Sequence, residues 1–251
     1  MSIRVVSALA LAAVASARTF TVYNACSFTV WPGMYTDLTA GSAVPDYTTG
    51  WEAAPYTSVS FNVPDNWNAG RIWGRRECDF STNPGPNSCV DGGCNGGLVC
   101  DPHTGTGVAP ATVAEWSLGD KQGLDNYDVS LVDGYNLPMR ITNNVGCPVA
   151  DCPVDLVANC PDNLKGPYDS AGNSVGCKSA CLAEPSNAAA CCNGPYVGGP
   201  EDCPSSGSSS YDYFKSNCPN SYAYAYDEPS GTALWYCDAS LNADYTLTFC
   251  P

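Results

Sequence analysis

The sequence predicts a mainly β protein, either a sandwich or a barrel, and three observations lead to this fold class. Short segments with alternating apolar and polar residues recur along the chain, as expected for half-buried strands. Turn-forming residues bound these segments, and the 24 glycines and 20 prolines favour turns over long helices. The 16 cysteines are an even number, which is typical of a disulfide framework in an exported protein.

The N-terminus has the features of a secretion signal. Arg4 supplies a positive charge, residues 5–14 form a short apolar run, and Ala15-Ser-Ala17 is a small-residue cleavage motif. The apolar run is too short to span a bilayer, and no later stretch is long enough. We therefore predict that residues 1–17 are a signal peptide and that a mature chain beginning near Arg18 is secreted, into the extracellular space or the cell wall.

The chain is strongly acidic, with a formal net charge of −15 from 10 basic and 25 acidic residues. Nucleic acids and anionic membranes would repel such a protein, so we expect neither as a partner. A neutral, hydroxyl-rich polymer such as a polysaccharide remains compatible with this charge, as does a simple role of the charge in solubility. The length is sufficient for one large domain with appendages.

Strand periodicity is clearest in three segments, residues 19–23, 57–61 and 245–249. Residues 113–117 form a fourth expected strand, in which Glu115 shares one face with Val113 while Trp116 points to the other. If Trp116 enters the core, Glu115 must point away from it.

The amino-acid composition of the chain changes from about Cys147. Cysteines crowd here, and proline and glycine interrupt the sequence every few residues, which predicts a loop-rich region held by disulfides. We expect short helical pieces at 155–160 and 209–217. The serine-rich segment 205–210 is typical of a flexible loop.

A series of motifs runs in order along the chain. These are Arg71-Ile-Trp-Gly-Arg75, Cys78-Asp-Phe80, Cys94-Asn-Gly-Gly-Leu98, Ala111-Thr-Val-Ala-Glu115, Tyr127-Asp-Val-Ser-Leu-Val-Asp-Gly-Tyr-Asn-Leu-Pro-Met139, Phe214-Lys215, Cys218-Pro-Asn-Ser-Tyr-Ala-Tyr224 and Thr248-Phe-Cys-Pro251. Together they resemble the thaumatin-like family, which includes the osmotins, and the segment 127–139 is the most specific. All sixteen cysteines follow the family's order, so the resemblance covers essentially the whole mature chain. Because the chain stops where the family's folded domain ends, no C-terminal targeting extension is expected.

The resemblance implies a flattened β-sandwich core with two lobes. The core would comprise residues 18–75, 111–153 and 219–251. A small disulfide lobe (76–110) and a disulfide-rich lobe (154–218) would pack beside it. A cleft between the core and the disulfide-rich lobe would then be the functional surface.

Spacing alone leaves the cysteine pairing open, because sixteen cysteines allow about two million pairings. The resemblance implies eight disulfides: Cys26–Cys250, Cys78–Cys89, Cys94–Cys100, Cys147–Cys237, Cys152–Cys218, Cys160–Cys177, Cys181–Cys191 and Cys192–Cys203.

The resemblance further implies an acidic cleft with five charged side chains, the cation Arg71 and four carboxyl groups: Glu115, Asp128, Asp133 and Asp227. Aromatic rings with a polar group suit sugar binding, and we add Tyr135 as a substrate-binding candidate. Asp128 and Asp133 are five residues apart, which would put them on opposite faces of a flat strand. Both can therefore face the cleft only if the turn at Asp133-Gly134, or a bulge, redirects one of them.

These residue types suit glycoside hydrolysis, which usually needs one protonated carboxyl group and one carboxylate. Crowded carboxylates raise one another's pKa, so one of them can stay protonated. We expect Glu115 to be the acid and Asp128 the base or nucleophile, with Glu115 the more desolvated of the two. Arg71 should contact the aspartates, because a cation beside Glu115 would lower its pKa. A tight Arg71–Glu115 pair would instead favour a protein that only binds.

The resulting prediction is a protein that acts on β-1,3-glucan or a related cell-wall polysaccharide, as a weak endo-β-1,3-glucanase. The alternative is a non-catalytic carbohydrate-binding or defence protein, antifungal or glycosidase-inhibiting; a structural or stress protein is a third hypothesis. No metal or other cofactor is expected, because the cysteines are paired and His103 is the only histidine. We expect a monomer.

Overall fold

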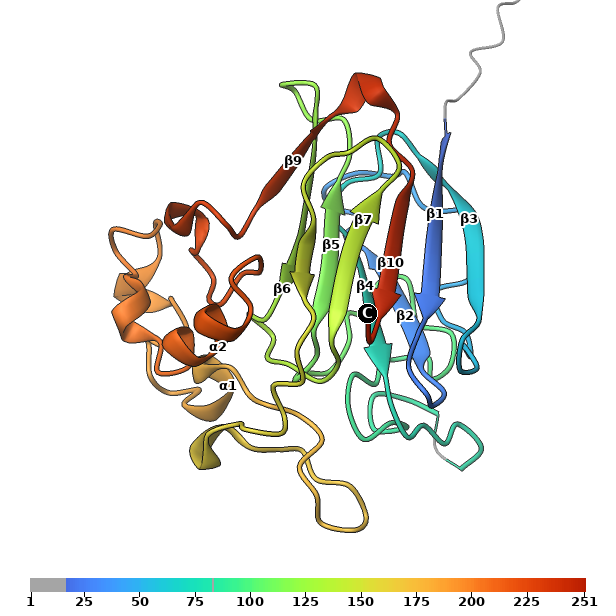
Figure 1. Ribbon diagram of the computed structural model, residues 1–251. Helices are drawn as coiled ribbons and strands as arrows, with labels where there is room; N and C mark the ends of the chain where they lie inside the picture. The colour runs from blue at the N-terminus through green and yellow to red at the C-terminus, as the bar shows by residue number, and fades with distance from the viewer. Residues whose placement is uncertain (1–16, 83) are drawn as a thin grey trace, which may run out of the picture.

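Two five-stranded sheets form the centre of the molecule in the computed structural model, which describes residues 17–82 and 84–251 (Figure 1). The first sheet has the order β3 (Ser58–Pro64), β1 (Ala17–Asn24), β10 (Tyr245–Phe249), β7 (Met139–Asn143) and β8 (Ala150–Cys152). The second has the order β2 (Trp31–Thr36), β4 (Gly70–Arg75), β5 (Val113–Ser117), β6 (Leu124–Ser130) and β9 (Trp235–Asp238). The β1–β10 pair is parallel and the others are antiparallel. The mainly β fold class is thus confirmed, and so are the four predicted strands. The signal peptide lies outside the described residues except for Ala17, which begins β1.

Aromatic rings fill the space between the sheets. Phe20 of β1 contacts Trp67 and Trp116, with ring centroids 5.7 and 5.2 Å apart, and Trp116 contacts Tyr245. Because Trp116 is buried in this core, strand alternation turns its neighbour Glu115 to the outer face of the second sheet. That outward orientation was expected from the sequence.

Helical structure in the described residues is short. It comprises α1 (Ala180–Ala183), α2 (Tyr211–Asn217) and single 3₁₀ turns at Asp162–Leu164, Gly194–Tyr196, Ser205–Gly207, Glu228–Ser230 and Ala239–Leu241. The helix expected at 209–217 is present as α2. The helical piece expected at 155–160 is wrong, because the Asp155 side chain accepts a hydrogen bond from the Val157 amide and forms a local turn. No helix in the described ranges is long and apolar enough to cross a membrane.

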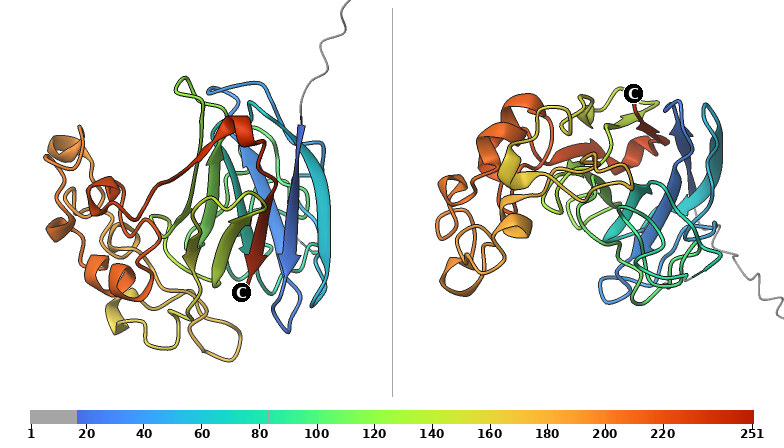
Figure 2. Two further views of the ribbon diagram at one scale, coloured as in Figure 1. Left: turned by 45° about the horizontal axis from the view of Figure 1, so that its top comes forward. Right: turned by 90° about the horizontal axis from the view of Figure 1, so that it is seen from below.

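All eight implied disulfides are present. Four of the bridges involve the disulfide-rich lobe, which lies to one side of the sheets in both views of Figure 2. This lobe also recruits residues that the sequence assigned to the core, because Tyr224 packs against Cys192 and Cys203.

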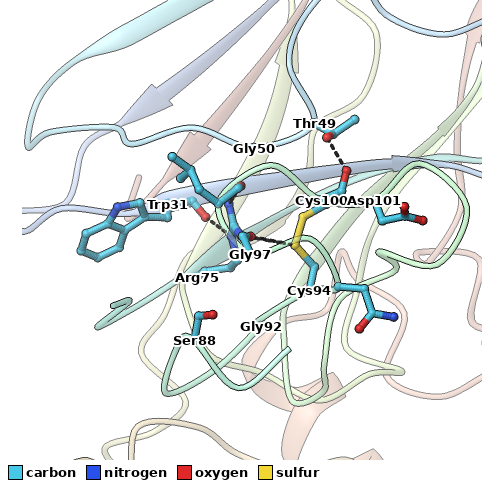
Figure 3. The surroundings of a disulfide bond; sticks show 12 residues. Trp31, Thr49, Gly50, Arg75, Ser88, Gly92, Cys94, Gly97, Cys100 and Asp101 are labelled. Atoms are coloured by element: carbon cyan, nitrogen blue, oxygen red, sulfur yellow. Dashed lines mark hydrogen bonds between the residues drawn. A yellow bond between two sulfur atoms is a disulfide. The ribbon is translucent and has the colours of Figure 1, made fainter. Parts of the chain in front are cut away.

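The small lobe is fastened to the second sheet by Arg75. Its fully buried guanidinium donates hydrogen bonds to four backbone carbonyl groups, those of Trp31, Pro32, Gly97 and Leu98. Figure 3 shows Arg75 beside the Cys94–Cys100 disulfide, 3.3 Å from the Cys94 sulfur. Burial lowers the pKa of Arg75 to about 10. This anchor holds the lobe against the sheet, so that the lobe's loop 106–109 forms one wall of the site described next.

Candidate functional site

A groove with a hollow of about 750 Å³ lies on the outer face of the second sheet. Its floor is formed by β2, β4, β5 and β6, and one wall is the loop 106–109 of the small lobe. A second hollow of about 300 Å³ shares its central residues and is closed by Tyr222, Ala225 and Glu228. No lining residue of either hollow belongs to 154–218. The expected cleft wall is therefore corrected: segment 222–234 forms it, not the disulfide-rich lobe itself.

Three charged side chains form a row across the groove floor. Arg71 on β4 is the direct cross-strand partner of Glu115 on β5, and Glu115 is the direct partner of Asp128 on β6. Directly opposite residues have Cβ atoms about 4.5–5.5 Å apart and point to the same face. Strand register thus brings together charges that are 44 and 13 positions apart in the sequence.

Asp133 joins this row from the loop after β6. The Gly134 amide donates to the Leu131 carbonyl in a tight turn, and Gly134 has a φ of +80°, which favours glycine. The turn directs the Asp133 carboxylate to Arg71 at 3.3 Å. The expected redirection at Asp133-Gly134 is therefore observed.

Arg71 contacts Glu115 as well as Asp133, and the expectation that it would contact only aspartates is wrong. Its Nη2 lies 2.8 Å from Glu115 Oε1, because the two residues are direct cross-strand partners. The pKa of Glu115 is raised overall: burial is the largest cause, the opposing charge of Arg71 is smaller, and the charge of Asp133 adds to the rise. The Glu115 side chain keeps a third of its surface exposed. Glu115 is thus a partly solvated carboxyl group with a bound cation.

Asp128 is the more desolvated carboxyl group, so the expected order of the two acids is reversed. Only 8% of Asp128 is exposed, and its Oδ1 has no hydrogen-bond partner among the described residues. Burial raises the pKa of Asp128 well above its usual range, and the charges of Glu115 and Glu228 raise it further against the opposing effect of Arg71. Asp128, rather than Glu115, therefore has the environment of a protonated acid.

Asp227 does not line the groove, contrary to expectation. It is 1% exposed, pairs with Lys215 at 2.9 Å, and accepts hydrogen bonds from the Tyr211 hydroxyl and the Ala223 amide. A 3₁₀ turn begins at the next residue, so Glu228 points into the groove in its place. Asp227 is a structural group.

Tyr135 also lies outside the groove. It is fully buried, and its hydroxyl donates to the Val154 carbonyl at 2.8 Å. Its backbone pairs with Cys177 across the junction to the disulfide-rich lobe, which keeps the ring in the interior. The assignment of Tyr135 to substrate binding is therefore wrong.

Several groove residues were missed by sequence reasoning. They are Tyr35, Asp37, Asn126, Leu234 and Glu228. Tyr222, one of the tyrosines that flank the carboxylate motifs in the sequence, also lines the groove, and its hydroxyl donates to Glu228 at 3.2 Å. Asn126 could have been found, because it precedes Asp128 by two positions on one strand and so shares its face. In the described part of the chain, no cluster of three or more His, Cys, Asp or Glu side chains is arranged to hold a metal ion.

The fold and the site define a class of disulfide-stabilised β-sandwich proteins with a carboxylate-lined groove across one sheet. The model of the thaumatin family matches residues 24–251, and the chain therefore belongs to that family. The resemblance seen in the motifs is thus confirmed.

Relatives and solved structures extend this comparison. Pathogenesis-related thaumatin-like protein 3.5 of Cryptomeria japonica is 43% identical over 240 residues, covering 94% of this chain and 91% of the relative. A Prunus avium protein named glucan endo-1,3-beta-glucosidase is 38% identical over 240 residues, covering 94% and 92%. The structure of a family 64 laminaripentaose-producing β-1,3-glucanase from Paenibacillus barengoltzii has a TM-score of 0.54 at 11% identity, covering 93% of this chain and 74% of that one. That structure shares the fold.

Proposed function

We propose that the protein is exported and recognises β-1,3-glucan chains of cell walls in the groove. The observation that carries this proposal is the row Arg71–Glu115–Asp128 on the floor of an open hollow. Carboxylates and a guanidinium offer charge-assisted hydrogen bonds to sugar hydroxyl groups. The relative named glucan endo-1,3-beta-glucosidase supports the choice of polymer, and the eight disulfides support an oxidising compartment.

Recognition without turnover is the activity that the Arg71–Glu115 pair supports best. Burial raises the pKa of Glu115, but the guanidinium at 2.8 Å stabilises its charged form and so opposes its use as a proton donor. It also holds the Glu115 and Asp133 carboxylates in fixed positions, which suits preorganised binding. The name of the Cryptomeria japonica relative supports a defence context for this recognition.

Slow hydrolysis is the second candidate, and the unpartnered oxygen of Asp128 favours it. The roles would be exchanged relative to the sequence-based expectation. Protonated Asp128 would give its proton to the glycosidic oxygen as the bond to the sugar breaks. Glu115, whose charged form Arg71 stabilises against the effect of burial, would act in its ionised form as the nucleophile or would take a proton from the attacking water.

Sedimentation with insoluble β-1,3-glucan tests the proposal, with insoluble β-1,4-glucan as the control polymer. We expect wild type to bind β-1,3-glucan and Arg71→Ala to bind at least about tenfold more weakly. The substitution removes the guanidinium as a hydrogen-bond donor and leaves Glu115 and Asp133 without the cation that holds them in position. Equal retention on both polymers, or none on either, would contradict the proposal.

Reducing-end release from soluble β-1,3-glucan separates the two candidates. Binding without release supports recognition alone. Release that is lost in both Asp128→Asn and Glu115→Gln, and that falls as the pH rises through the elevated pKa of Asp128, supports hydrolysis. Release that persists unchanged in both variants contradicts it.

A further inference from the structure

A third hollow of about 500 Å³ continues the groove beyond the end of β5. Ser117 at the end of β5 lines both this hollow and the central one, so the two are neighbours on the molecular surface. Three loops surround the new hollow, residues 40–42, 66–68 and 118–122. Strands advance about 3.3 Å per residue, so Ser117, where the two hollows meet, lies about 7 Å along β5 from Glu115. A linear polymer in the central groove could reach it.

The backbone of these loops is fixed by hydrogen bonds. The Asn68 side chain donates to the Ala40 carbonyl and accepts from the Ala69 amide, and the Leu118 amide donates to the Trp67 carbonyl. The Asp120 carboxylate accepts from the amides of residues 122 and 124 and from the Asn126 side chain, which closes the β5–β6 turn. The three loops are therefore tied to one another and to the sheet.

A buried ion cluster lies beneath two of the loops. Arg18 pairs with Asp125 and, at 3.1 Å, with Asp65, just before the loop 66–68. Asp125 also accepts a hydrogen bond from the Gly119 amide of the turn. Arg18 and Asp125 are 3% and 0% exposed, so this ion pair is shielded from solvent, and with Asp65 it holds both loops in place.

Three polar side chains at the edge of this hollow are free of the hydrogen bonds that fix the loop backbone. Asn66, Lys121 and Gln122 are exposed, and none of them makes a side-chain hydrogen bond or ion pair with another described residue. Two amides and an ammonium group thus face an open hollow on a preorganised frame. Such groups match the hydroxyl groups of a neutral sugar, which both donate and accept hydrogen bonds.

We propose that this hollow is a distal subsite that binds sugar units of the same polysaccharide chain that occupies the central groove. The proposal rests on the proposed function of that groove. Asn66 and Gln122 contact the distal sugars, and the protein consequently prefers long chains to short ones.

Calorimetric titration with β-1,3-linked glucose oligomers of increasing length tests this subsite. Wild type should bind more tightly as the oligomer grows, until it spans both hollows. In Asn66→Ala/Gln122→Ala we expect binding of long oligomers to weaken about tenfold, and binding of short ones to change less than about twofold, because two hydrogen bonds are lost only at the distal end. Neither side chain supports the fold, and Asn62→Ala, an exposed position on β3 of the other sheet, is the matched control and should bind like wild type.

The outcomes distinguish the two proposals. A wild-type affinity that does not depend on length, or an equal loss for short and long oligomers in the double variant, would overturn the distal subsite and leave glucan recognition intact. If wild type binds no oligomer of any length, both proposals are overturned.

Discussion

Asp128 is an acidic side chain that folding places in an unfavourable environment. It is buried, one of its oxygens has no partner among the described residues, and its nearest charged neighbours include Glu115 and Glu228. An unsatisfied buried acceptor costs about 1–3 kcal/mol. Such strain at a groove is typical of a residue retained for function rather than for stability.

We predict that Asp128→Asn stabilises the protein at pH 7 by about 1–3 kcal/mol. The folded-state pKa of Asp128 is raised above the unfolded value of about 3.9, so the folded state binds the proton more tightly. The penalty from the charged form is therefore present above the folded pKa and disappears as the pH falls below the unfolded one. Denaturant unfolding at pH 7 and near pH 3.5 measures the difference, which should shrink at the lower pH.

Asp133→Asn is the control for this prediction. Asp133 is half exposed and paired with Arg71, so its removal should change the free energy of unfolding by less than about 1 kcal/mol. A loss of stability in Asp128→Asn at pH 7 would show that the carboxylate is better satisfied than the geometry indicates.

At the scale of elements, the groove depends on how the small lobe is held against β2 and β4. Arg75 is the anchor, because one guanidinium connects the carbonyl groups of β2 with those of the lobe. A planar group with five donors can serve four carbonyl groups in this way, whereas an ammonium group with three donors cannot.

Arg75→Lys should therefore destabilise the protein by about 2–4 kcal/mol, since at least one buried carbonyl loses its partner and the lysine remains buried. Thermal unfolding measures this loss, and hydrogen exchange should show faster opening of residues 94–107 than of β5. Arg140→Lys is the matched control, because the Arg140 side chain is 37% exposed and a lysine there can keep its pairing with Asp151, so the change should cost less than about 1 kcal/mol. Equal effects of the two substitutions would contradict the anchoring role.

At the scale of the whole molecule, the disulfides close loops of very different length. Cys26–Cys250 joins residues 224 positions apart and ties the end of β1 to the end of β10, whereas Cys181–Cys191 spans 10 positions within one lobe. In the chain-entropy description, a longer loop restricts the unfolded chain more strongly.

Replacing both members of Cys26–Cys250 by alanine should lower the free energy of unfolding by about 5 kcal/mol, against about 3 kcal/mol for Cys181–Cys191. Chemical denaturation of the two double variants under oxidising conditions measures this difference. If the short bridge proves the more important, local packing in the lobe outweighs the restriction of the unfolded chain.

Local pattern was sufficient for β1, β3, β5 and β10 and for the outward orientation of Glu115. Alternation depends only on which neighbouring residues are apolar, so Trp116 in the core implies Glu115 on the opposite face. It failed at 155–160, where the Asp155 side chain competes for a backbone amide. The disulfide pairing came from motifs and their order, since spacing alone leaves it open.

The sequence by itself determined the family, the β-sandwich, the eight bridges and the identity of Arg71, Glu115, Asp128 and Asp133 as a group. Only the tertiary structure decided which carboxyl group is desolvated, which one the arginine holds, and that Glu228 rather than Asp227 enters the groove. The physical reason is that pKa and ion pairing depend on burial and on distances across strands. Residues far apart in the chain set these quantities, and no local pattern encodes them.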